Sequence, residues 1–188
     1  MALGTVLPDT NVCTPIVLLD LVLRMDEVRL HQFLWSEDLL DELVRVWVRL
    51  GRSSEAALAI CRQIRDAFPS GEVSRAEYEH LIETMPGTDA SDHPHAAAAV
   101  VRAPSTILTA NIRDFPPDRL TALGVTVVHP DGYLCGLARE EPQAFVQVIT
   151  EMAEDRHKPA MTAQEVLDAL SRAGVTEFAE QMRPLMPG

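Results

Sequence analysis

Apolar residues follow two spacings along the first two thirds of the chain, and each predicts a different element. Short runs of consecutive apolar residues are typical of strands buried on both faces, and they occur at 3–8, 30–35, 105–109 and 125–128. Apolar residues three or four positions apart are typical of amphipathic helices, and they occur at 16–25, 36–50, 53–68 and 95–101. Strands that alternate with helices predict an α/β fold, a three-layer α/β/α domain with a central parallel sheet.

Polar residues and glycines mark the ends of several of these elements. Ser36 is a candidate helix N-cap, because acidic residues follow it at the positive end of the helix dipole. Gly51 is placed to end the same helix. The stretch 72–85 fits either a strand or a helix, and turn-forming residues at 86–91 separate it from the alanine-rich helix.

From about residue 139 onward, only helical patterns remain. Pro142 is placed to begin a helix that runs to about Arg156. Thr162 begins a capping-box pattern for a second helix, and 176–182 predicts a third. We therefore divide the chain into an α/β domain at 1–138 and a C-terminal helical extension at 139–188.

Composition narrows the class of protein. The 188 residues include 28 acids and 16 bases, a net charge of −12, which argues against a broad basic face for nucleic acid. The three cysteines are widely spaced and form no C-x-x-C pair, which excludes a zinc ribbon or a disulfide framework and predicts buried free thiols. The most apolar run, 12–23, is too short and too interrupted to cross a bilayer. We expect no signal peptide, no membrane partner and a cytoplasmic location.

Acidic residues fall where the predicted strands end. Asp9 ends the first strand, Asp114 follows the strand at 105–109, and Asp89 and Asp92 precede the alanine-rich helix. Glu42 lies in the helix after the second apolar run. Because ligands of open parallel sheets bind beyond the carboxyl ends of the strands, these acids are candidates for one site.

Carboxylates that converge repel one another and need a cation between them. Oxygen-only ligands favour Mg²⁺ or Mn²⁺ over Zn²⁺, and such a site can activate water for attack on a phosphodiester. Each acid also has a plain alternative as a turn, cap or loop residue or, for Glu42, as a solvated residue paired with Arg45 or Arg49.

Four stretches, in the same order as in the family, resemble PIN-domain ribonucleases and especially toxins of the VapC type. Residues 7–12 resemble the opening D-T-N motif, and 35–42 resemble the segment that ends on the family's helical Glu. Residues 89–99 resemble the D-x-x-D loop with its alanine-rich helix, and 109–116 resemble the T-x-N-x-x-D-F-P motif. The resemblance covers roughly 5–138, and the helical tail resembles an extension carried by one subset of these toxins.

The resemblance implies a metal-binding and catalytic quartet with supporting residues. Position by position, the quartet is Asp9, Glu42, Asp92 and Asp114, with Asp89 as a further acid. Asn11 is implied to orient Asp9 or the attacking water. Thr109 and Asn111 are implied to hold the fourth acid or the scissile phosphate.

The resemblance also implies an activity and partners. It implies an endoribonuclease that uses Mg²⁺ or Mn²⁺ and acts as the toxin of a type II toxin–antitoxin pair. The implied partners are an RNA substrate, a small cognate antitoxin and a second copy of the chain. Two alternatives remain: a nuclease of this fold that acts on branched DNA, and an inactive protein-binding module.

Histidines and arginines near the acids raise further alternatives. His93 and His95 form an H-x-H pattern typical of zinc ligands, but no other histidine lies at ligand spacing, so we expect a surface or helix-start role. Arg113, Arg45 and Arg49 are candidate RNA-phosphate contacts, and a solvated helix face or a pair with a neighbouring acid is the alternative.

Overall fold

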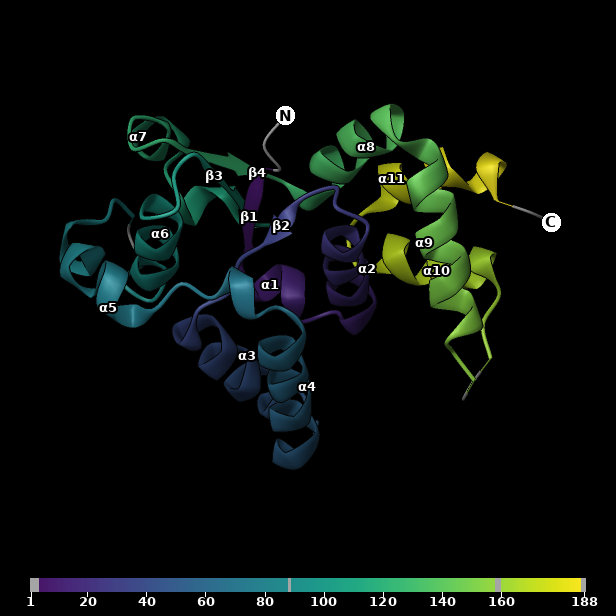
Figure 1. The fold of residues 1–188 in the computed structure, drawn as a ribbon, viewed down its shortest axis with the longest axis horizontal. Coiled ribbons are helices and arrows are strands. Elements are labelled where there is room, and N and C mark those ends of the chain that lie inside the picture. Colours follow the sequence, from purple (N-terminus) through teal and green to yellow (C-terminus); the bar gives the residue numbers. More distant parts are fainter. Residues whose placement is uncertain (1–3, 88, 158–159, 187–188) are drawn as a thin grey trace.

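A four-stranded parallel sheet lies at the centre of the computed structural model, which describes residues 4–87, 89–157 and 160–186 (Figure 1). The strand order is β2–β1–β3–β4, and every pair is parallel. The strands are β1 (Thr5–Pro8), β2 (Gln32–Phe33), β3 (Ser105–Leu108) and β4 (Val125–Val128). All four predicted strands are present, although Leu3, with which the first was predicted to begin, lies outside the described residues.

Alternate residues of the strands point into two apolar clusters, one on each face of the sheet. Val6 and Leu108 belong to one cluster, whereas their neighbours Leu7 and Ile107 belong to the other. This alternation follows from the two-residue repeat of a strand. Helices cover both clusters, so the predicted three-layer α/β/α arrangement is confirmed.

The helices of the first part surround the sheet as the sequence predicts, with small shifts at their ends. The longer ones are α2 (Ile16–Glu27), α3 (Glu37–Arg49), α4 (Ser54–Ala67) and α6 (His93–Val100). The Ser36 side chain accepts a hydrogen bond from the Leu39 backbone N–H at 3.3 Å, as its role as N-cap requires. Gly51 follows α3 with a φ of +93°, a conformation that favours glycine.

Short helical turns fill several connections. The ambiguous stretch 72–85 is helical, because it forms α5 (Arg75–Tyr78) and the 3₁₀ turn η2 (Glu79–Thr84). Buried Tyr78 belongs to the cluster that α6 also lines, so packing decides what the local pattern leaves open. The remaining turns are α1 (Thr10–Cys13), α7 (Pro117–Thr121), η1 (Pro69–Gly71), η3 (Ile112–Asp114) and η4 (Arg183–Leu185).

The C-terminal helices pack on the side of the sheet where α2 lies (Figure 1). They are α8 (Pro130–Glu140), α9 (Pro142–Glu154), α10 (Ala163–Arg172) and α11 (Thr176–Met182). Helix α8 is absent from the sequence-based prediction, and the division proposed at residue 138, which stays a prediction, falls inside it. Arg24 of α2 forms an ion pair with Asp155 at 2.7 Å and so ties α2 to the end of α9.

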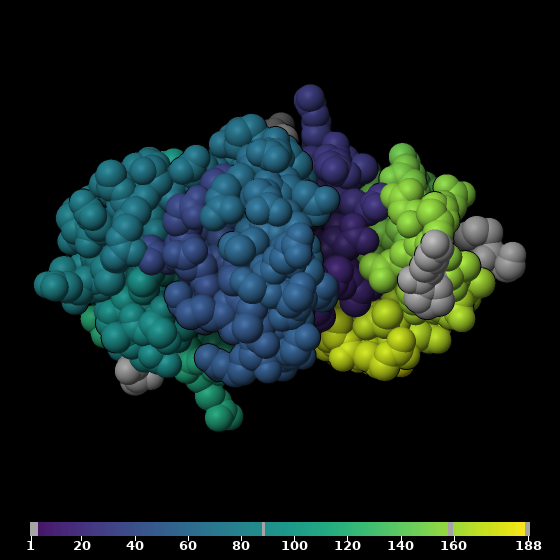
Figure 2. Space-filling model, turned by 90° about the horizontal axis from the view of Figure 1, so that it is seen from below, coloured from purple at the N-terminus to yellow at the C-terminus, as the bar shows by residue number. Residues whose placement is uncertain are grey.

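The thiols and the surface bear on two further expectations. Cys13, Cys61 and Cys135 are free and buried, which confirms that part of the sequence analysis. No helix in the described ranges is both long and apolar enough to cross a membrane. From below, the surface of α3 and α4 lies between that of α5 and that of the C-terminal helices (Figure 2).

Candidate functional site

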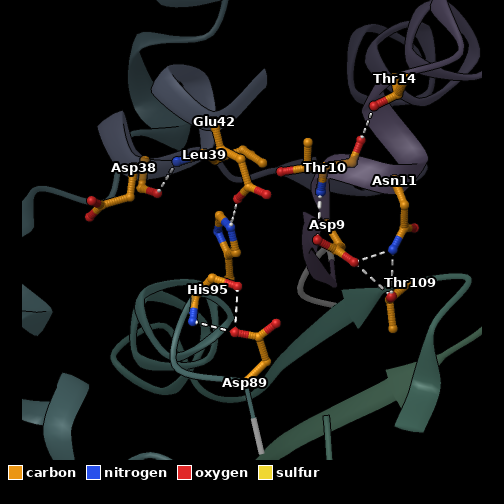
Figure 3. Close-up of polar contacts among 12 residues, drawn as sticks. Asp9, Thr10, Asn11, Thr14, Asp38, Leu39, Glu42, Asp89, His95 and Thr109 are labelled. Carbon is orange, nitrogen blue, oxygen red and sulfur yellow. Dashed lines mark hydrogen bonds and ion pairs between the residues drawn. The ribbon is translucent and has the colours of Figure 1, made fainter. Parts of the chain in front are cut away.

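The pairing of β1 with β3 brings Asp9 and Thr109 together. Pro8 lies opposite Leu108 in the register, and the Asp9 backbone N–H donates to the Leu108 carbonyl at 2.8 Å. The next residues therefore leave the sheet at the same edge. Thr109 Oγ1 donates to Asp9 Oδ2 at 2.8 Å, so the two strand ends meet through these side chains (Figure 3).

The Asp9 carboxylate is held from several directions although it is only 6% exposed. Its Oδ1 accepts from the Thr10 backbone N–H at 2.7 Å, and its Oδ2 also accepts from Asn11 Nδ2. Burial raises the pKa of Asp9, and the hydrogen bonds from Thr109 and Thr10 offset part of that rise. Such a buried acid favours a nearby positive charge, because its anion lacks solvent.

Asn11 and Asn111 fix the acids at the ends of β1 and β3. Asn11 contacts Asp9, and its Oδ1 accepts from the Ala110 backbone N–H at 3.0 Å. Asn111 Nδ2 donates to Asp114, so Asn111 holds the fourth acid as the resemblance implies. Thr109 holds the first acid and not the fourth.

Glu42 reaches the same edge of the sheet from α3, where it pairs with His95 of α6. His95 Nε2 lies 2.7 Å from Glu42 Oε2, and His95 is only 1% exposed (Figure 3). The hydrogen bond from His95 lowers the pKa of Glu42. Burial lowers the pKa of His95, but the hydrogen bond to Glu42 and the charge of Asp9 outweigh it, so the net direction is upward.

His95 lies in the first turn of α6, as the helix-start alternative had it, but it is not on the surface. It lies in the interior and faces an acid, whereas His93 Nε2 faces the Gly87 carbonyl at 3.4 Å. The alternative in which Glu42 forms an ion pair with Arg45 or Arg49 is not observed, because its ion-pair partner is His95. A signal was present in the sequence, because His95 is the one titratable residue in the alanine-rich helix 95–101.

Asp92 lies at the start of α6, but its side chain does not cap the helix. Its Oδ2 is buried and has no hydrogen-bond partner within the described ranges. Burial, together with the negative charges of Asp9, Asp114 and Asp89, raises the pKa of Asp92 to about 6. An acid in this state is suited to bind a cation or to take up a proton near neutral pH.

Asp89 is exposed and closes a turn. Its Oδ1 accepts hydrogen bonds from the Ser91 backbone N–H at 2.9 Å and from Ser91 Oγ at 2.7 Å. These bonds lower the pKa of Asp89. The turn interpretation of this residue therefore agrees with the structure, although Asp89 also borders the site.

All five predicted acids line one hollow of about 310 Å³, which we call the acid hollow. Its lining consists of Asp9, Thr10, Asn11, Thr14, Glu42, Val46, Asp89, Ser91, Asp92 and Asp114. Thr109 and Asn111 support it through Asp9 and Asp114. Arg113 is exposed and does not belong to this lining.

The acid hollow fits Mg²⁺ or Mn²⁺ in its chemistry. Its ionisable lining is entirely carboxylate, and Asp92 Oδ2 is a buried oxygen that lacks a partner. Within the described ranges, no three His, Cys, Asp or Glu side chains are already arranged as a metal site. Most of these acids instead contact a side chain of the protein, as Glu42 contacts His95.

Comparison with known proteins gives two matches. A family model described as the VapC50 C-terminal domain matches residues 130–184. A protein of Mycobacterium tuberculosis (strain ATCC 25618 / H37Rv) named "Putative ribonuclease VapC50" is 32% identical over 142 residues, which covers 75% of this chain and 79% of that protein. No solved structure matches significantly.

The ion pair between His95 and Glu42 predicts how Glu42 titrates. In metal-free protein, His95→Leu removes the hydrogen-bond donor and should raise the pKa of Glu42, as measured by carbon NMR of the carboxyl groups. His95→Gln retains a donor and should raise it less. His93→Leu is the matched control, and equal Glu42 titration in all three variants would contradict the assigned pair.

The raised pKa of Asp92 predicts a pH-dependent gain in stability for Asp92→Asn. The folded state binds the Asp92 proton more tightly than the unfolded state does. The contribution of Asp92 to the free energy of unfolding therefore falls as pH rises from 3.8 through about 6. In metal-free protein, the variant should gain on the order of 1 kcal/mol in unfolding free energy at pH 8 and less at pH 5, measured with urea. Asp89→Asn should show no such gain, and a loss for Asp92→Asn at pH 8 would refute the assignment.

Proposed function

Because the chain belongs to the VapC family of PIN-domain ribonucleases, we propose that it is a metal-dependent endoribonuclease. The observation that carries this proposal is the acid hollow, where five carboxylates from separate parts of the chain meet beyond the ends of β1 and β3. Its donors would hold Mg²⁺ or Mn²⁺ through Asp9, Glu42, Asp92 and Asp114, with Asp89 at the rim. A bound ion of this kind lowers the pKa of water and neutralises charge that develops on a phosphate.

The residues of the chain supply positioning and proton transfer. Thr109 and Asn11 hold the Asp9 carboxylate in one orientation, and His95 holds Glu42. We propose that Asp92 Oδ2 takes a proton from the attacking water, because this buried carboxylate oxygen at the acid hollow has no hydrogen-bond partner among the described residues. Water oxygen then bonds to phosphorus and the bond to the 3′ oxygen breaks with its electron pair on that oxygen. The 3′ oxygen takes a proton from solvent water, and Asp92 later returns its proton to solvent, so the products end in a 5′-phosphate and a 3′-hydroxyl.

Arg113 is a proposed phosphate contact at the rim. It is exposed beside Asp114 and forms no ion pair within the described ranges. The neighbouring Asp114 is held by Asn111. Arg113 is therefore available to a substrate phosphate.

We also propose that the protein is the toxin of a type II toxin–antitoxin pair in the cytoplasm. Family membership supports this role, with a small antitoxin as partner and a homodimer as the assembly. Exposed apolar side chains on α3 and α4, among them Val48 and Leu58, offer surface suited to a protein partner.

Loss of an acid should abolish RNA cleavage without unfolding the protein. Asp9→Asn should reduce the rate on single-stranded RNA with Mn²⁺ at least about a hundredfold, because it removes a charge from the centre of the site. Asp118→Asn, at an exposed position of α7, is the matched control and should cleave at the wild-type rate.

Two further arms of this assay address the rival functions. Full cleavage by an EDTA-treated sample would refute metal dependence. A preference for branched DNA over single-stranded RNA would favour the DNA nuclease. If neither substrate is cleaved and Mn²⁺ does not bind in a calorimeter, the protein-binding module remains.

The toxin role predicts a growth phenotype. Expression of the chain alone should arrest growth, and Asp9→Asn should not, because arrest requires cleavage. Co-expression of the small protein encoded beside it should restore growth, and the two should co-purify. Unimpaired growth with a protein that cleaves RNA in vitro would contradict the toxin role.

A further inference from the structure

A second hollow adjoins the acid hollow along α3. It measures about 430 Å³ and is lined by Asp38, Glu42, Arg45, Val46, Arg49, Ser91, Pro94 and His95. Glu42, Val46 and Ser91 line both hollows, so they form a shared wall. We call the second one the arginine hollow.

The acids of the arginine hollow already have partners. Asp38 forms an ion pair with Arg75 and accepts a hydrogen bond from Tyr78 Oη. Glu42 is paired with His95. Neither acid therefore forms a direct contact with the arginines of the same hollow, although the charge of Arg45 helps to lower the pKa of Glu42.

The side chains of Arg45 and Arg49 form no hydrogen bond or ion pair with any part of residues 4–87, 89–157 and 160–186. Both are exposed, and they lie four residues apart on α3, so they project from one face of that helix. Other arginines, such as Arg62 and Arg113, also form no ion pair among the described residues, and Arg45 and Arg49 differ from them in lining the arginine hollow. Six other arginines do form ion pairs: Arg24, Arg65, Arg75, Arg102, Arg156 and Arg183.

The arrangement suits a phosphodiester. A guanidinium group is a planar fork of donors that matches phosphate oxygens, and two such groups one turn apart can hold an anion together. A substrate strand whose scissile phosphate lies in the acid hollow would pass the shared wall at Glu42 and enter the arginine hollow. Contacts of this kind position a strand without reading its bases.

Resting on the function proposed above, we propose that the arginine hollow binds the RNA phosphate next to the one that is cleaved. Arg45 and Arg49 supply the contacts, and the strand follows α3 from Glu42 toward Arg49. Such a site would let an acidic protein bind RNA. It places two cationic side chains next to the acid hollow, on the proposed path of the RNA strand. It also requires a substrate that extends at least one phosphate beyond the cut.

The test removes each arginine and compares the loss with a matched exposed arginine. Arg45→Gln, Arg49→Gln and the double variant are measured on single-stranded RNA with Mn²⁺. Arg62→Gln on α4 is the control, because Arg62 is exposed and lines neither hollow. The double variant should raise KM roughly tenfold with little change in kcat, because the lost contacts are charge-assisted hydrogen bonds that bind substrate outside the reacting centre.

Salt dependence and substrate length separate a phosphate contact from a general effect of charge. The slope of log kcat/KM against log salt should become shallower by about 0.7 for each arginine removed, the value expected for one contact to a single strand. A minimal substrate that carries only the scissile phosphate should be cleaved equally by wild type and variants. If Arg45→Gln and Arg49→Gln match Arg62→Gln on long RNA, the proposal is wrong.

A binding measurement keeps this inference distinct from the catalytic one. In the Asp9→Asn background, anisotropy of a labelled RNA should show weaker binding for the double arginine variant than for Arg62→Gln. If wild type cleaves RNA but binding does not depend on Arg45 and Arg49, only the proposed phosphate site in the arginine hollow is refuted. If wild type does not cleave RNA, but the double arginine variant still binds RNA more weakly than Arg62→Gln, the proposed ribonuclease activity is refuted and the phosphate site is retained. If RNA neither binds nor is cleaved, both are refuted.

Discussion

Burial of the Asp9 carboxylate at the edge of the sheet is the constraint on which the site depends. A desolvated anion must be compensated, and Asn11 supplies a hydrogen bond from two residues along the chain. Thr109 supplies one only because β1 and β3 end side by side. A one-residue slip of the register would turn alternate side chains to the opposite faces of the sheet and separate Asp9 from Thr109. The apolar clusters on both faces resist such a slip, so the core fixes the position of the first acid.

The other acids are arranged around this first one by separate local devices. His95 holds Glu42 from inside α6, Asn111 holds Asp114, and Ser91 closes the turn at Asp89. Asp92 alone among them keeps a buried oxygen without a partner in the described ranges, and its raised pKa reflects burial and the neighbouring charges. The net charge of −12 is thus compatible with a polyanionic substrate, since five of the 28 acids line the acid hollow, where a bound cation would offset their charge.

The strand ends and their acids could be predicted from the sequence. Asp9 and Asp114 follow buried strands, and in a parallel sheet the residues that follow the strands lie at the same edge. The alanine-rich helix around His95 hinted at its burial, but its pairing with Glu42 could not be predicted, since it depends on how closely α3 approaches α6. Helix α8 escaped prediction because Gly132 and Gly136 weaken its local pattern. Its stability comes from contacts made elsewhere, such as Asp131 accepting hydrogen bonds from the backbone N–H groups of Glu177 and Phe178 at 3.0 and 2.8 Å.

One of the two apolar clusters runs without interruption from the sheet into the C-terminal helices. Val6 of β1 and Leu18 of α2 belong to the same cluster as Phe145 of α9 and Phe178 of α11. The tail therefore completes the hydrophobic core on that face, and it is not an independent attachment. Folding of the α/β part and of the tail should be coupled, so that the protein melts in a single cooperative transition. A chain released before its last helices are made would expose this face and remain unable to assemble its site.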